Sequence, residues 1–174
     1  MKNLIISMFV VMVVTSCTPP PPDTSAFDEG IAKFNANVEI VDATFNLFEN
    51  GDLDGMIANY ADDLIWSPPN TSDSLSKEVL AEGMRGWHAE FENFTFRDRQ
   101  YYPGVSEGDY IPDGGVRVYG VWDFTHKATG KVLSQKYYAV LQCNDEGKIV
   151  TDLEWFDLGL SLIHISEPTR RYAI

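Results

Sequence analysis

The stretch that decides the fold is VRVYGVWDFTHKATGKVLSQKYYAVLQCNDEGKIVTDLEWFD, residues 116–157. Apolar and polar residues alternate through much of it, and a period of two is typical of strands that bury one face. Ala128-Thr129-Gly130 predicts a three-residue hairpin loop with Gly130 in the left-handed conformation. A four-residue turn is predicted at Asn144 to Gly147. We therefore expect three long antiparallel strands, at residues 116–126, 131–143 and 148–157.

The residues before these strands carry helical periodicity. Asn50-Gly51 ends the first helical pattern, Asp52 is placed to cap a short second helix, and Ser76 is placed to cap a third. The apolar positions follow the 3.6-residue period; they are Phe34, Val38, Val41, Phe45 and Phe48 in the first helix, Leu53, Met56, Ile57 and Tyr60 in the second, and Leu80, Met84, Trp87, His88 and Phe91 in the third. Further strands are predicted at residues 64–67 and 94–102. Helices followed by a meander of strands predict an α+β fold.

The N-terminus resembles a bacterial lipoprotein signal. Lys2 precedes an apolar run over residues 4–14, and Val14-Thr15-Ser16-Cys17 resembles a lipobox. The resemblance implies a signal peptide over residues 1–16, lipid on Cys17, and a Pro-rich tether over residues 17–26. Thr18 follows the cysteine, so the implied location is the cell envelope, on the periplasmic face of the outer membrane. The alternatives are a plain secretory signal with an incidental cysteine, or an N-terminal membrane helix.

The C-terminus resembles a laboratory sequence. LSLIHISEPTR, residues 160–170, matches one reading frame of a sequencing-library adapter. We therefore interpret residues 160–174 as an artefact and exclude them from fold reasoning. One domain of ordinary size, residues 27–159, remains.

Charge and cysteine content narrow the function classes. The formal net charge of −13 disfavours a nucleic-acid partner, because such a surface repels phosphates. If Cys17 carries lipid, Cys143 is the only thiol left, so no intrachain disulfide is expected. His88 and His126 lie too far apart for a zinc-site spacing, and His126 is expected to be exposed at a hairpin end. The sequence has no phosphate loop or dinucleotide fingerprint, and no cofactor is predicted.

Three short motifs carry a family resemblance: Phe48-Glu49-Asn50-Gly51-Asp52, Tyr60-Ala61-Asp62-Asp63, and Gly147-Lys148-Ile149 together with Trp155-Phe156-Asp157. In this order the chain resembles the nuclear-transport-factor-2-like superfamily, close to its SnoaL-like members, over about Phe34 to Gly159. The resemblance implies a cone, in which a curved antiparallel sheet wraps about three N-terminal helices around one deep pocket. The superfamily includes isomerases, hydrolases, cyclases and non-catalytic binders, so the fold alone does not give the function.

Two carboxylates are predicted to share the inner face of the sheet. The three-residue loop would place Asp123 opposite Gln135, and the four-residue turn would place Glu154 opposite Tyr137. The pair then resembles the two carboxylates of limonene-epoxide-hydrolase-like members. The arginine that bridges them in those proteins corresponds to Val121 here.

These observations favour a lipid-anchored binding domain for a small apolar or ring-bearing molecule. The alternatives are a cofactor-free hydrolase or isomerase that uses Asp123, Glu154 and His88, and a dimerisation or scaffold module, such as a homodimer with a filled pocket. His88 is interpreted either as a pocket base or as a buried histidine satisfied by a neighbouring carbonyl. The predicted ligand-binding residues are Trp66, Trp87, Phe91, Tyr119, Val121, Gln135, Tyr137, Asp152 and Phe156.

Overall fold

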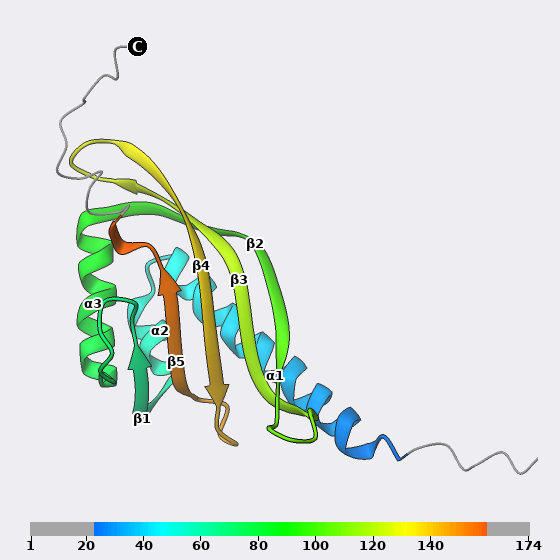
Figure 1. Ribbon diagram of the computed structural model, residues 1–174. Helices are drawn as coiled ribbons and strands as arrows, with labels where there is room; N and C mark the ends of the chain where they lie inside the picture. The colour runs from blue at the N-terminus through cyan, green and yellow to red at the C-terminus, as the bar shows by residue number, and fades with distance from the viewer. Residues whose placement is uncertain (1–22, 160–174) are drawn as a thin grey trace, which may run out of the picture.

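A computed structural model describes residues 23–159, and its elements follow the predicted order (Figure 1). The predicted signal peptide, Cys17 and the adapter-like tail lie outside the described residues. Within residues 23–159, none of the helices has the length and apolar character that crossing a membrane requires. The elements are α1 (Ser25–Glu49), α2 (Leu53–Ala58), β1 (Tyr60–Ser67), α3 (Lys77–Glu90), β2 (Phe91–Val105), β3 (Pro112–His126), β4 (Lys131–Cys143) and β5 (Ile149–Phe156).

The helices form where the periodicity places them. The predicted apolar face of α1 buries Val41, Phe45 and Phe48. The helix begins at Ser25, two residues inside the segment predicted as tether, and ends before Gly51, whose φ of 75° stops it. Asp52 caps α2 as predicted, because its side chain accepts a hydrogen bond from the Gly55 N–H at 2.9 Å.

The third helix begins at the predicted position without the predicted cap. Ser76 is the N-cap residue of α3, but its side chain donates to the Glu78 carboxylate at 2.6 Å and makes no capping bond. Leu80 and Met84 are buried, as the helical pattern predicts. Phe91, predicted as the last apolar residue of this helix, is the first residue of β2.

The five strands form one open sheet in the order β1-β5-β4-β3-β2. The predicted antiparallel sheet is confirmed for β2 to β5, and at one edge β1 pairs parallel to β5. Figure 1 shows the long strands β2, β3 and β4 curving across α1, with α3 beside β1. The arrangement is an α+β cone in which the helices cover the inner face of the sheet.

The β3–β4 hairpin corrects the predicted register. His126 pairs with Lys131, so the loop has four residues rather than three. Asp123 therefore pairs with Ser134, and Gln135 pairs with Trp122. A shift of one residue exchanges the two faces of a strand. As a result Tyr119, Val121 and Asp123 lie on the outer face, and Trp122 and Phe124 lie on the inner face.

The side chains of β5 lie on the predicted faces of the sheet, but the residues of β4 with which they pair differ from the prediction. Glu154 pairs with Ala139, and Tyr137 pairs with Phe156, a total shift of two residues. One residue comes from the turn, which has five residues between Cys143 and Ile149 rather than four, and the other comes from an irregularity between Gln142 and Cys143. An even shift leaves each side chain on its original face. Glu154 and Tyr137 therefore both lie on the inner face, as the sequence predicted.

An ion-pair network fixes β2 against α1. The Arg99 guanidinium binds Asp42 through Nη1 at 2.7 Å and Glu49 through Nη2 at 2.8 Å. Asp98, just before this arginine, has a φ of 56° at an irregularity in the β2–β3 pairing. This bulge bends the strand, and the arginine holds the bent strand over the helix.

Candidate functional site

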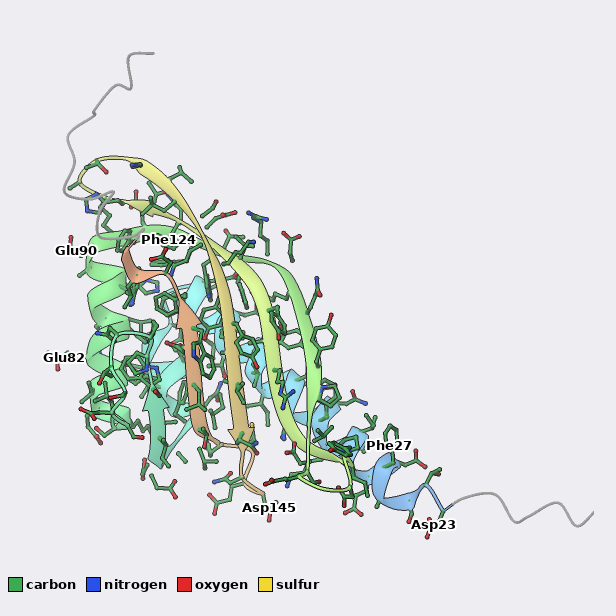
Figure 2. All side chains as sticks on the ribbon, in the orientation of Figure 1. Asp23, Phe27, Glu82, Glu90, Phe124 and Asp145 are labelled. Carbon is green, nitrogen blue, oxygen red and sulfur yellow. The ribbon has the colours of Figure 1, made fainter. Side chains whose placement is uncertain are left out.

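A cavity of about 70 Å³, called the central pocket below, lies between the sheet and the helices. A water molecule needs about 10–15 Å³ by this measure, so the pocket has room for roughly five waters or a compact organic group. Phe124, one of the residues that line the pocket, lies near Glu90 at the end of α3 (Figure 2). This end of the molecule is far from Asp23, where the described chain begins. The lining residues are Phe45, Phe48, Met56, Met84, Trp87, Phe94, Trp122, Phe124, Gln135, Tyr137, Glu154 and Phe156.

Glu154 is the acidic group of the pocket lining. It is 8% exposed, and the Tyr137 hydroxyl donates to its Oε1 at 3.0 Å. Burial raises the pKa of Glu154 to about 7, although the hydrogen bond from Tyr137 and the indole N–H of Trp66 oppose the rise. The Trp66 N–H is buried close to this carboxyl, without a hydrogen bond of ordinary geometry. Near neutral pH, Glu154 is therefore divided between its acid and carboxylate forms.

Asp152 lies two residues earlier on the same face of β5, behind the pocket wall. It is 1% exposed, and its Oδ2 accepts a hydrogen bond from the Tyr60 hydroxyl at 3.0 Å. Burial first, and then the neighbouring Glu154, raise the pKa of Asp152 well above its ordinary range. The two carboxyls thus form a buried pair that resists carrying two negative charges.

His88 lies beside the pocket rather than in its lining. Its ring packs on Phe48 and Phe94 with centroid distances of 4.6 and 4.5 Å. Burial lowers the pKa of His88, and a hydrogen bond with the Phe48 backbone partly opposes this. His88 is half-buried, and its Nε2 has no hydrogen-bond partner among the described residues.

Asp123 stands on the opposite side of the sheet from Glu154. Its carboxylate binds Arg97 Nε at 2.7 Å and accepts a hydrogen bond from Ser134. The hydrogen bonds from Arg97 and Ser134 lower the pKa of Asp123. The predicted pairing of Asp123 with Glu154 across one cavity is therefore wrong, and Asp152 is the carboxyl that lies next to Glu154.

The other predicted ligand-binding residues fall into three groups. Trp87, Gln135, Tyr137 and Phe156 line the central pocket. Trp66, Phe91 and Asp152 are buried outside its lining. Tyr119 is 45% exposed on the outer face, where it stacks on Tyr138 at 4.5 Å, and Val121 lies on that same face.

Sequence reasoning missed more than half of the lining. The missed residues are Phe45, Phe48, Met56, Met84, Phe94, Trp122 and Phe124. Most of them were already identifiable as buried from the helix periodicity. The register error removed Trp122 and Phe124 from the predicted inner face. Among residues 23–159, no cluster of His, Cys, Asp or Glu is placed to hold a metal ion.

The chemistry available in the pocket is that of one acid in an aromatic cavity. Glu154 can donate or accept a proton, and Tyr137 and Gln135 supply hydrogen-bonding groups beside it. The rings around them offer a large apolar contact surface. Such a site suits a small, mostly apolar molecule with one polar group.

Comparison with known proteins finds a matching family model and structures with a similar fold. A family model described as SnoaL-like domain matches residues 41–151. A search of curated proteins finds no match. Among solved structures, a proposed polyketide cyclase from Xanthomonas campestris pv. campestris has a TM-score of 0.63 at 17% identity, over 77% of this chain and 99% of that one.

Two further structures share the fold at similarly low identity. An NTF2-like protein from Burkholderia xenovorans LB400 has a TM-score of 0.56 at 18% identity, over 74% of this chain and 95% of that one. A protein with a ketosteroid isomerase-like fold from Catenulispora acidiphila DSM 44928, solved in complex with trimethylamine, has a TM-score of 0.57 at 18% identity, over 75% of this chain and 94% of that one.

Proposed function

The chain belongs to the SnoaL-like domain family, and on that premise we propose that it binds a small apolar or ring-bearing molecule in the central pocket. The observation that carries the proposal is the pocket lining, in which eight of twelve residues are aromatic and two are methionine. An apolar cavity with a few polar groups is the usual form of a small-molecule site. The trimethylamine bound by the Catenulispora protein is consistent with a small ligand in this fold.

Methionine-methyl NMR tests the proposal, because Met56 and Met84 both line the pocket. Their resonances are assigned in the full chain with single Met→Leu variants, and the protein is titrated with benzyl alcohol. We expect saturable shifts of both methyl signals. The variant Gln135→Trp should fill the pocket and abolish the shifts, whereas Ile65→Trp, on the outer face of β1, should preserve them. Methyl signals that stay unmoved at millimolar benzyl alcohol would contradict the proposal.

We also propose that lipid on Cys17 anchors the protein in the cell envelope, on the periplasmic face of the outer membrane. The support is the lipobox resemblance of Val14 to Cys17. The variant Cys17→Ser should block processing or release the protein from the membrane fraction. Unchanged processing together with unchanged membrane partition would argue against the anchor.

A second candidate function is cofactor-free acid–base catalysis, as in a hydrolase or isomerase. The observation that favours it is Glu154, a buried pocket carboxyl with a pKa of about 7. Exchange of the α-protons of cyclohexanone in D₂O, followed by NMR, measures proton abstraction directly. Catalysed exchange that rises with pH around 7 and disappears in Glu154→Gln would support this function. Exchange at the buffer rate would leave binding as the function.

A homodimer is proposed through the outer face of the sheet. Tyr102, Tyr119, Tyr138 and Trp155 form a row of ring contacts there, with neighbouring centroids 4.5–5.8 Å apart. Tyr102, Tyr119 and Trp155 are each 45–50% exposed. Exposed apolar patches of this kind mark interaction sites. Sedimentation of Trp155→Lys should show a monomer where the unmodified chain shows a dimer; equal masses would contradict this interface.

A further inference from the structure

The lining of the central pocket contains an acidic side chain but no basic one. Glu154 is the one acidic residue among the twelve that line the pocket, and none of the twelve is Lys, Arg or His. The polar groups that face its carboxyl from the neighbouring strands are Tyr137 on β4, Tyr60 and Trp66 on β1, and Asp152 on β5 itself. None of these groups carries a positive charge.

These charges determine which ligand charge the pocket prefers. An anionic ligand would meet an acid pair with no cation to offset it, in a protein whose formal net charge is −13. A cationic ligand would supply the opposite charge that the buried carboxyl lacks, and the acidic surface would raise its concentration near the protein. The pocket therefore favours cations over anions.

The aromatic lining favours the same charge. The faces of Trp, Tyr and Phe rings attract a nearby ammonium group, most strongly where water is excluded. Trp87, Trp122 and Tyr137 are among the eight rings around the cavity. Quaternary ammonium recognition commonly combines aromatic rings in this way.

The scarcity of acceptors limits the type of ammonium. A primary ammonium carries three N–H donors, each of which needs an acceptor when it is buried. Among the twelve lining side chains, only Glu154, Gln135 and Tyr137 carry an oxygen that can accept a hydrogen bond, so a primary ammonium would have to reach all its acceptors within this small group. An alkylated nitrogen with one N–H or none suits this surface better.

We propose that the ligand of the central pocket is a compact alkylammonium, tertiary or quaternary, whose cationic head lies against Glu154 and the surrounding rings. This inference rests on the proposed binding function and adds the chemical class of the ligand. The size agrees, because a trimethylammonium head with a short chain has about as many heavy atoms as a cavity of about 70 Å³ can enclose.

Isosteric probes separate the charge of a ligand from its shape. Choline and 3,3-dimethylbutan-1-ol differ in one atom, a nitrogen in place of a carbon, and so in one positive charge. 3,3-Dimethylbutanoate has the same tert-butyl body with a negative charge. Each is titrated into the full chain at pH 8, with the methyl signals of Met56 and Met84 as reporters. We expect choline to bind at least about tenfold more tightly than the neutral isostere, and the anion to bind most weakly.

The pH profile gives a second readout. Because the cation favours the ionised form of Glu154, choline affinity should fall about tenfold per pH unit below pH 7, and affinity for the neutral isostere should stay nearly flat. In Glu154→Gln the pH dependence of choline binding around pH 7 should disappear and the preference for choline should fall, because only the aromatic contacts then favour the cation. The neutral isostere should still bind and thereby report a folded pocket. Asp123→Asn removes a carboxylate from the outer face and should change the choline affinity less than about twofold.

The outcomes separate the two proposals. Equal affinity for choline and 3,3-dimethylbutan-1-ol, or tighter binding of the neutral or anionic probe, would overturn the alkylammonium inference and leave the binding function standing. A flat pH profile for choline in the unmodified chain would overturn it as well, even if Glu154→Gln did not fold. Methyl signals that respond to none of the three probes, nor to benzyl alcohol, would overturn both.

Discussion

Replacing Glu154 with Gln should make the protein more stable at pH 8 and leave its stability at pH 5 nearly unchanged. The glutamine side chain has almost the same shape, and its amide oxygen can still accept the hydrogen bond from Tyr137. The substitution removes only the ability of the buried group to ionise. The difference between the pH profiles of the unmodified chain and the variant therefore measures the cost of that ionisation, including its effect on the neighbouring Asp152.

The magnitude follows from the pKa of the folded protein. The pKa of Glu154 rises from 4.5 to about 7 on folding, and each unit corresponds to about 1.4 kcal/mol. Because the folded pKa is the higher one, the unfolded chain loses its proton first as the pH rises. The contribution of Glu154 to stability is then fully present below pH 4.5, and about 3 kcal/mol of it is lost between pH 4.5 and pH 7, with little further loss above. Most of this loss falls between pH 5 and pH 8.

Urea unfolding at pH 5, 6, 7 and 8 measures the effect. The free energy of unfolding of Glu154→Gln should exceed that of the unmodified chain by roughly 2–3 kcal/mol at pH 8, with a much smaller difference at pH 5. Asp123→Asn is the matched control. The pKa of Asp123 is lowered, so its contribution to the free energy of unfolding changes with pH only below the ordinary pKa of a carboxyl group. If the unmodified chain and Glu154→Gln show parallel stability profiles between pH 5 and pH 8, the buried-acid reasoning is refuted.

Three other substitutions test features that position the site. Asp52→Ala should cost about 1 kcal/mol in urea unfolding, because the Gly55 N–H loses its cap; an unchanged midpoint would show that the cap contributes nothing. Arg99→Met should cost about 2 kcal/mol, because it leaves Asp42 and Glu49 partly buried without a cation, whereas Arg97→Met, at an exposed ion pair, should cost below about 1 kcal/mol; equal costs would contradict the anchoring role of Arg99. Gly130→Ala should cost about 1 kcal/mol, because its φ of 67° disfavours a side chain, and a neutral effect would argue against this turn geometry.

Helix and strand positions were predictable from the sequence where one signal dominated. The apolar spacing in α1 and the glycine after it fix that helix and its end. The cap at Asp52 fixes the start of α2 for the same local reason. The parallel pairing of β1 with β5 was not predictable, because it joins residues about 90 positions apart and leaves no local pattern.

The error at Asp123 has a specific physical origin. Along β3, large apolar side chains occupy both faces: Trp122 and Phe124 point inward, and Tyr119 and Val121 point outward. The hydrophobic pattern therefore does not fix which face is buried, and the register rested on loop length alone. Gly130 can adopt its left-handed conformation in a loop of three residues or in a loop of four, so this glycine does not distinguish the two registers.

His126 and the helix residues of the pocket were misjudged for related reasons. His126, expected to be exposed at the hairpin end, is 4% exposed because β3 continues over Phe91, with which its ring makes contact. Phe45 and Phe48 were identified as core, but a sequence does not show which core residues border a cavity. That depends on how completely the neighbouring side chains fill the space.

The central claim is that a small molecule binds inside the central pocket, and an isotope-filtered NOE measurement tests it most directly. The full chain, with ¹³C-methyl methionine, is saturated with choline or benzyl alcohol. The account predicts intermolecular NOEs from the ligand protons to the methyl groups of both Met56 and Met84, which line the cavity from α2 and α3. Saturable binding without an NOE to either methyl group would place the ligand elsewhere and contradict the claim.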